Sequence, residues 1–176
     1  MGTIGIYPGS FDPFTLGHYM LVKKMYESRL FDKVVILIAN NPNKKHMFNG
    51  NERREIVKLS LRYDEYWTRD FITIESTFGR TVDILDHYPD NNIVLVRGLR
   101  DGFDLAYENQ LAIINKHLKQ NLQTIYFPCD PAYGYISSFL VRNLIENDGD
   151  ITGLVSHPDV KTYIQDQRRI LEEFVE

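Results

Sequence analysis

Apolar residues follow two alternating patterns along the chain. Short apolar runs that are rich in β-branched residues and bounded by Gly, Pro, Asn or Asp are typical of strands. Five such runs occur, at residues 3–7, 33–40, 71–75, 93–97 and 124–127. Between them, apolar residues recur three or four positions apart, as Leu21 and Met25 do, which predicts helices. Strands that alternate with helices favour an α/β fold, with a doubly wound, Rossmann-like sheet of five parallel strands and flanking helices.

Capping and periodicity indicate where several helices lie. Asn49, with Glu52 three residues later, has the spacing of a capping box and predicts the start of the second helix. The clearest helical stripe consists of Tyr107, Leu111, Ile114 and Leu118. A last, C-terminal helix is predicted over about 157–175. Because no repeat or linker interrupts the chain, we expect a single domain over residues 1–176, with its core over about 1–153.

Composition and charge exclude several classes of protein. An apolar share of 43% and a charged share of 25% are typical of a folded globular chain. The net charge of −4 argues against a general nucleic-acid-binding surface. The longest apolar stretch, 34–39, is too short to span a bilayer, and no signal peptide is expected. The single cysteine, Cys129, excludes an intramolecular disulfide and a multi-cysteine zinc site. We therefore expect a cytoplasmic protein without membrane or nucleic-acid partners.

The loop after the first apolar run has features of an anion site. Ligands of doubly wound sheets bind outside the carboxyl ends of the strands, where this loop lies. It is neither a Walker A loop nor a Gly-x-Gly-x-x-Gly turn. Gly9 allows a ligand to approach the backbone, and Thr15 and Gly17 open a helix whose free N–H groups favour an anion. His18 would direct an imidazole at that anion. The alternative is that Thr15 only caps the helix and His18 is solvated.

Two other loops at the same edge of the sheet carry lysines or hydroxyl groups. Lys44 and Lys45 follow the second run, and either lysine would neutralise phosphate charge or be ordinary solvated surface. Ser137 and Ser138 open a helix after the fifth run. They would hold a nucleotide's phosphates or serve only as an N-cap. The residue types leave both pairs of alternatives open.

Two arginines end the fourth run. Arg97 and Arg100 flank a glycine, and an arginine at the end of a buried strand must be paired or face a cleft, because burial of an unpaired charge is costly. A grip on phosphate is one interpretation. A structural ion pair with Asp101 or Asp104 is the other. Glu108, about one turn beyond Asp104, would face either the cleft or solvent.

Taken together, these loops resemble those of the bacterial phosphopantetheine adenylyltransferases, which belong to the nucleotidylyltransferase superfamily with its (Thr/His)-x-Gly-His signature. The resemblance covers residues 4–153. It rests on residues 7–13, Thr-Leu-Gly-His at 15–18, Pro-Asn-Lys-Lys at 42–45, Arg-Gly-Leu-Arg at 97–100 and Ile-Ser-Ser at 136–138. The first motif alone specifies only the superfamily, whereas the ordered set is much more specific.

The resemblance implies transfer of AMP from ATP to 4'-phosphopantetheine in coenzyme A biosynthesis, which yields dephospho-coenzyme A and pyrophosphate. It also implies a homohexamer and Mg²⁺ bound mainly through the ATP phosphates, with no metal-ligating residue assigned. The implied catalytic residues are Ser10, His18, Lys44 and Arg100. Contacts to the acceptor are implied for Ser10, Lys44, Thr81 and Arg97. Contacts to ATP are implied for Ser10, Phe11, His18, Gly98, Leu99, Arg100, Glu108, Tyr133, Gly134, Tyr135, Ile136, Ser137, Ser138 and Phe139.

The chain departs from the family pattern at several positions. Phe139 replaces a usual third serine, Tyr133 and Gly134 replace a usual Trp-Ser pair, and Thr81 replaces an apolar residue. Two alternatives follow. One is an adenylyltransferase of the same superfamily that acts on nicotinamide mononucleotide, although that relative usually has His where this chain has Thr15. The other is a non-catalytic nucleotide-binding module.

Overall fold

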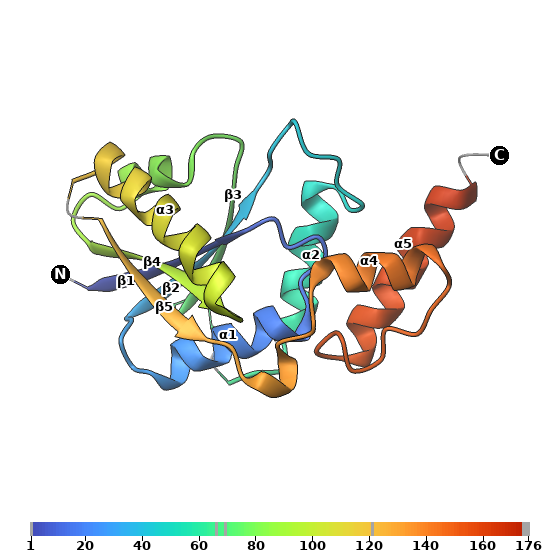
Figure 1. The fold of residues 1–176 in the computed structure, drawn as a ribbon. Helices are drawn as coiled ribbons and strands as arrows, with labels where there is room; N and C mark the ends of the chain where they lie inside the picture. Colours follow the sequence, from blue (N-terminus) through green and yellow to red (C-terminus); the bar gives the residue numbers. More distant parts are fainter. Residues whose placement is uncertain (1, 66, 69, 121, 174–176) are drawn as a thin grey trace.

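The computed structural model describes residues 2–65, 67–68, 70–120 and 122–173, and in it five parallel strands form one sheet (Figure 1). The strands are β1 (Thr3–Gly9), β2 (Lys33–Ala39), β3 (Ile72–Thr77), β4 (Asn92–Leu99) and β5 (Gln123–Pro128). Their order is β3-β2-β1-β4-β5, and every pairing is parallel. The predicted doubly wound sheet is therefore confirmed. The order reverses between β1 and β4, which is where such sheets bind their ligands.

Helices flank the sheet on both faces. They are α1 (Leu16–Glu27), α2 (Gly50–Leu61), α3 (Gly102–Leu118), α4 (Ser138–Glu146) and α5 (Pro158–Glu173), with 3₁₀ helices η1 (Thr81–His87) and η2 (Pro131–Tyr133). The third predicted helix thus takes the tighter 3₁₀ form. The end of the last predicted helix, 174–175, lies outside the described residues. Within the described chain, no helix is both long and apolar enough to cross a membrane.

The strand side chains alternate between two apolar layers. On β2, Val34, Ile36 and Ile38 join a large cluster with residues of α1, α2, α4 and α5. Val35 and Leu37 face the other way, toward a smaller cluster that includes residues of η1. This alternation follows from the period of two in a strand and explains why the buried runs read as continuously apolar.

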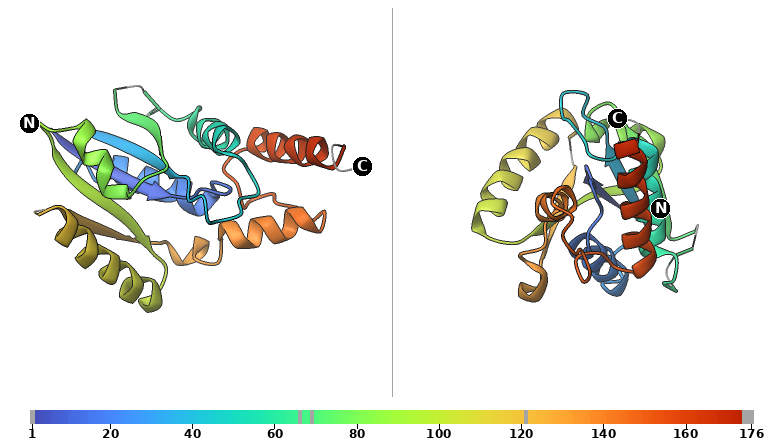
Figure 2. Two further views of the ribbon diagram at one scale, coloured as in Figure 1. Left: turned by 90° about the horizontal axis from the view of Figure 1, so that it is seen from above. Right: turned by 90° about the vertical axis from the view of Figure 1, so that its right-hand side faces the viewer.

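Two helices, α2 and α5, are held in place by specific contacts. The capping box predicted for α2 is present: Asn49 Oδ1 accepts the N–H of Glu52 at 3.0 Å, and Glu52 Oε2 accepts the N–H of Asn49 at 2.7 Å. The last helix, α5, lies alongside α2 (Figure 2) and buries Val160 and Ile164 completely. The C-terminal helix therefore completes the larger apolar cluster.

Helix α3 differs from the others, because only Glu108 among its residues is buried. The predicted stripe is helical, but Tyr107, Ile114 and Leu118 of that stripe are exposed. A helical period shows which residues share a face without showing what covers that face.

Candidate active site

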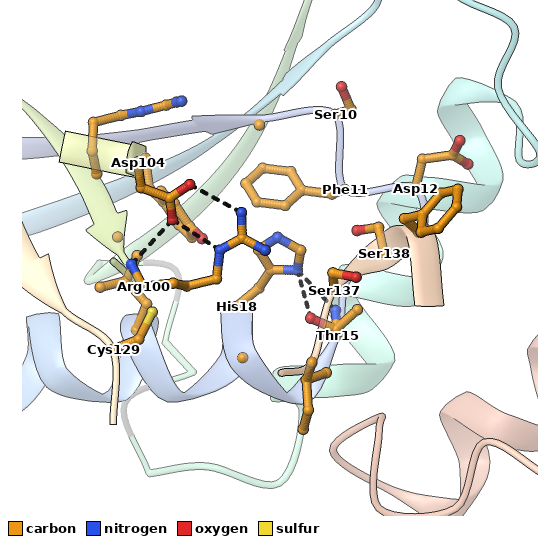
Figure 3. A pocket seen from close by; sticks show the side chains of 18 of the residues that line it. Ser10, Phe11, Asp12, Thr15, His18, Arg100, Asp104, Cys129, Ser137 and Ser138 are labelled. Carbon is orange, nitrogen blue, oxygen red and sulfur yellow. Dashed lines mark hydrogen bonds and ion pairs between the residues drawn. The ribbon is translucent and has the colours of Figure 1, made fainter. Parts of the chain in front are cut away.

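A cleft of about 590 Å³ opens at the carboxyl ends of β1, β4 and β5 (Figure 3). It brings together residues from all four loops that the sequence singled out. The predicted site residues that line it are Ser10, Phe11, His18, Lys44, Arg97, Gly98, Arg100, Glu108, Tyr133, Ile136, Ser137, Ser138 and Phe139. The switch point of the sheet therefore coincides with the candidate chemistry.

The first loop folds tightly over its own aromatic residues. A Cβ atom on Gly9 would lie 2.7 Å from the ring of Phe11, so any larger residue would collide with it. Phe11 adopts a left-handed backbone conformation, with φ of 49°, and its ring packs edge-on against Tyr7 at 5.1 Å between centroids. This uncommon conformation for a non-glycine residue is held by the burial of the ring.

His18 is oriented by the backbone at the start of α1. The N–H of Thr15 donates to His18 Nδ1 at 2.9 Å, so the neutral ring carries its proton on Nε2 (Figure 3). The imidazole also packs against Phe11 and Phe14, with centroids 5.2 and 5.3 Å away. Burial, reinforced by the positive charges of Arg100 and Arg97, lowers the pKa of His18 to about 4. At neutral pH His18 is therefore an uncharged hydrogen-bond donor.

Both arginines at the end of β4 have carboxylate partners on α3. Arg97 Nε donates to Glu108 Oε2 at 2.7 Å, and its Nη1 donates to the carbonyl oxygen of Pro8 at 2.8 Å. Arg100 Nε donates to Asp104 Oδ2 at 2.9 Å, and this hydrogen bonding lowers the pKa of Asp104 (Figure 3). The structure thus corrects the ion-pair alternative for Arg97, whose partner is Glu108 and neither Asp101 nor Asp104.

The lysine and serine loops reach the cleft from its other sides. Lys44 Nζ lies 3.4 Å from Ser10 Oγ, and Lys45 is not among the lining residues. Ser137 is the N-cap of α4, since its Oγ accepts the N–H of Leu140 at 3.1 Å. The N-termini of α1 and α4 both border the cleft, where their N–H groups and dipoles favour an anion.

A family model described as cytidylyltransferase-like matches residues 6–144. A phosphopantetheine adenylyltransferase of Thermotoga neapolitana is 37% identical over 157 residues, which are 89% of this chain and 91% of the relative. The enzyme of the same name from Bordetella avium is 36% identical over 172 residues, which are 97% of this chain and 96% of the relative. The chain belongs to the phosphopantetheine adenylyltransferase family. The sequence-based prediction of a nucleotidyltransferase of this family is therefore confirmed.

Solved structures confirm the fold of this family member. A putative nicotinate-nucleotide adenylyltransferase from Vibrio parahaemolyticus has a TM-score of 0.71 at 18% identity and covers 96% of this chain and 94% of its own. A nicotinic acid mononucleotide adenylyltransferase from Plasmodium falciparum in complex with NaAD also has a TM-score of 0.71 at 18% identity, and covers 95% of this chain and 96% of its own. These likenesses concern the architecture alone.

Some residues assigned from the family pattern lie outside the main cleft. Leu99, Gly134 and Tyr135 do not line it, and the Tyr135 side chain is exposed. Thr81 lines a second hollow of about 110 Å³, which shares Pro8, Arg97 and Glu108 with the main cleft. The ligand contacts assigned to these residues remain predictions.

Three polar residues near the cleft were missed by sequence reasoning. Asp12 and Arg53 are buried, and Asp12 also lines the cleft. Arg142 lines the cleft as well and donates to the carbonyl oxygen of Asp12. Asp12 lies inside the first motif, so its position was a usable signal. Arg142 follows the Ile-Ser-Ser motif in the pair Val141-Arg142, which resembles part of the motif of the nicotinamide mononucleotide relatives. Arg53 sits within a helical pattern, where an arginine is usually solvated, so the sequence held no comparable signal for it.

Proposed function

We propose that the chain transfers AMP from ATP to 4'-phosphopantetheine and releases pyrophosphate and dephospho-coenzyme A, a step of coenzyme A biosynthesis. Family membership supports the reaction class. The observation that carries the proposal is the neutral His18, whose proton lies on Nε2 because Nδ1 accepts the Thr15 N–H. Such a donor, together with Lys44 and Ser10, suits a reaction that moves charge between phosphate groups.

The ATP phosphates would lie between the N-termini of α1 and α4. His18 and Arg100 border this part of the cleft, and the N–H groups that open both helices favour anionic oxygens. The aromatic side chains of Tyr133 and Phe139 line the outer part of the same cleft. They offer flat apolar surfaces for a base, which supports the ATP contacts that the family resemblance implies for residues 133–139.

The acceptor would enter from the side of Lys44 and Arg97. Its phosphate would be held near Ser10 Oγ, which lies 3.4 Å from Lys44 Nζ. The second hollow continues past Arg97 and is lined by Thr81, Leu111 and other residues of mixed polarity. A pantetheine arm, which has amide and methylene groups, suits such a lining.

The transfer needs no protein nucleophile. An oxygen of the acceptor phosphate attacks the α-phosphorus of ATP in line, the new P–O bond forms, and the bond to the β-phosphate bridging oxygen breaks. Pyrophosphate leaves with the electron pair of that bond. The donors His18 and Lys44 stabilise charge on the phosphoryl oxygens and hold both reactants in position.

Magnesium would enter with ATP and is treated as part of that substrate. The cleft carboxylates already have partners: Asp104 binds Arg100 and Glu108 binds Arg97. We therefore assign no resident metal ion to these two carboxylates. Magnesium commonly retains several waters and binds through substrate phosphates, which fits this arrangement.

We also propose that the chain acts as a cytoplasmic homohexamer, with residues 1–176 as one domain. The number six rests on the family resemblance. The structure supports association through α3 and β5, because β5 is an edge strand and α3 exposes large apolar side chains. These side chains are Phe103, Leu105, Tyr107, Ile113, Ile114 and Leu118.

An acceptor screen tests the proposed reaction. Pyrophosphate release from ATP should require 4'-phosphopantetheine and should not occur with nicotinamide mononucleotide. Lys44→Ala should lower kcat/KM for the acceptor by about 100-fold, as loss of a charge-stabilising donor does, and Lys45→Ala serves as the matched control. Turnover with nicotinamide mononucleotide instead would support the alternative acceptor. ATP binding without turnover of either acceptor would support a non-catalytic module.

A further inference from the structure

A buried carboxylate, Asp12, ties together the two loops on the acceptor side of the cleft. It borders the main cleft, but its side chain is only 1% exposed and both carboxylate oxygens are engaged by backbone N–H groups. Asp12 Oδ2 accepts the N–H of Met47 at 3.0 Å, and Oδ1 accepts the N–H of Phe48 at 2.9 Å. Charge-assisted bonds of this kind are stronger than neutral ones. The carboxylate thus joins backbone segments about 35 residues apart.

The two joined segments carry the groups that would hold the acceptor phosphate. Asp12 follows Ser10 by two residues, and Met47 follows Lys44 by three. The Asp12 hydrogen bonds therefore fix the loop that bears Lys44 relative to the turn that bears Ser10. The separation of 3.4 Å between Ser10 Oγ and Lys44 Nζ depends on this register.

Arg53, on α2, ties the same segments through further hydrogen bonds. Its guanidinium is buried, with the residue 2% exposed. Nη1 donates to the carbonyl oxygens of Ser10 at 2.8 Å and Ala39 at 3.2 Å, and Nη2 donates to Asn40 Oδ1. One planar group thereby reaches the Ser10 turn and the start of the loop that leads to Lys44.

The chemistry of Arg53 indicates more than packing. Among the described residues, the acceptors of its hydrogen bonds are carbonyl oxygens, and no carboxylate is in salt-bridge contact with it. Burial of a cation without such a partner is costly, and burial lowers the pKa of Arg53. An apolar side chain of similar volume would often be at least as stable in such a place. The fixed fork of donors is what an apolar residue would not supply.

We propose that Asp12 and Arg53 are positioning residues that hold Ser10 and Lys44 at the spacing required by the acceptor phosphate. This inference rests on the proposed transfer reaction. Both side chains bond to the backbone of these segments, so we assign neither of them a contact with a substrate. Their loss should therefore impair use of the acceptor while binding of ATP, at the α1 and α4 N-termini, is retained. A purely structural role would instead lower stability without that selectivity.

The test is a double-mutant cycle between Asp12→Asn and Lys44→Ala. Asp12→Asn keeps the shape but replaces one acceptor oxygen by a donor. It should lower kcat/KM for 4'-phosphopantetheine by about 10- to 100-fold, since small misplacements of reacting groups cost this much, with KM for ATP changed less than about twofold. In the Lys44→Ala background the same substitution should change kcat/KM by no more than about twofold, the tolerance expected of additivity.

The matched control is Asp32→Asn. Asp32 also accepts a backbone N–H, that of Thr3 at 2.7 Å, but it lies at the opposite end of the sheet. Its substitution should leave both kinetic constants unchanged. Hydrogen exchange gives a readout independent of activity: the Met47 and Phe48 amides should exchange faster in Asp12→Asn and normally in Asp32→Asn.

Arg53→Lys keeps the positive charge but loses the planar set of guanidinium donors. It tests the inference independently if Asp12→Asn does not fold. It should show the same loss for the acceptor and the same absence of effect in the Lys44→Ala background. Multiplicative effects in either cycle, equal losses for ATP and the acceptor, or failure of both variants to fold would overturn the inference. Absence of turnover by the wild-type chain would instead refute the proposed reaction, a separate outcome.

Discussion

At the scale of single residues, His18 is held by a backbone N–H rather than by a carboxylate. A carboxylate partner would favour the imidazolium, whereas the Thr15 N–H at 2.9 Å favours a ring whose Nδ1 is unprotonated. Burial, reinforced by the nearby arginines, acts in the same direction by lowering the pKa of His18 to about 4. The site thus keeps a donor that needs no change in protonation between reactants and products.

The two ring nitrogens of His18 can be separated by substitution. Asparagine places its oxygen near the Nδ1 position, and glutamine places its amide nitrogen near Nε2. His18→Asn should keep the bond from Thr15 but lower kcat by about 100- to 1,000-fold, because the donor to the phosphoryl oxygens is lost. His18→Gln should retain more activity and lose more stability. Steady-state kinetics and thermal unfolding of both variants check this, and equal rate losses would contradict it.

The residue types indicated which loops carry the candidate site residues, but not which side chains pair with one another. Glycine, lysine and arginine at strand ends were readable from the chain because parallel strands bring their carboxyl ends to one edge. The partner of Arg97 was not readable, because Asp104 and Glu108 lie one turn apart on α3 and only the packing of that helix decides between them. The roles of Asp12 and Arg53 depend on contacts between distant segments, which a local pattern does not encode.

At the scale of elements, the N-terminus of α4 has two separable properties. The Ser137 hydroxyl caps the helix by accepting the Leu140 N–H, and the same end of the helix borders the cleft. The cap contributes stability, while the free N–H groups and the dipole contribute a site for anions. Ser137 therefore stabilises the fold directly. It supports nucleotide binding indirectly, because it keeps that helix end in place.

Two substitutions at Ser137 should separate its effect on stability from its effect on ATP binding. Ser137→Ala removes the cap and should lower the free energy of unfolding by about 1 kcal/mol. Ser137→Asp preserves the cap but adds a negative charge beside the proposed phosphate site, so it should retain stability and raise KM for ATP. Denaturant unfolding and kinetics check the pair. If KM for ATP is unchanged in Ser137→Asp, the ATP phosphates do not bind at this end of α4.

The local sequence pattern predicted the helices and strands correctly where their side chains are well buried. The runs of β1, β2 and β4 and the capping box of α2 were predicted because their signals are local. The 3₁₀ form of η1 was not predicted, since Val82 and Leu85 fit either helical period. The apolar stripe predicted helix α3 correctly, but the exposure of that stripe depends on the rest of the molecule.

At the scale of the whole molecule, the sheet is unequally covered. The β1, β2 and β4 strands are largely buried, whereas β5 has no buried residue and α3 has only Glu108. A hollow of about 510 Å³ between them is lined by Ile113, Leu122 and other residues. Exposed apolar surface of this kind usually marks an interface.

Ile113→Glu tests whether this face joins copies of the chain. The Ile113 side chain is 70% exposed, so the substitution should not disturb the fold, but burial of the new charge in an interface would be costly. Sedimentation velocity should give a smaller assembly than for the wild type. Leu30→Glu, an exposed apolar position in the turn between α1 and β2, should leave the mass unchanged. A wild-type monomer, or an unchanged mass in Ile113→Glu, would refute the proposed interface.

The ion pair of Arg97 and Glu108 forms part of the wall of both the main cleft and the second hollow. An anion that draws Arg97 away from Glu108 on one side therefore alters the surface met by a ligand on the other. Affinities for the two substrates should then be thermodynamically linked, and the linkage must be reciprocal in magnitude. Calorimetric titration of each ligand with and without the other would measure it, and Glu108→Gln should change its size.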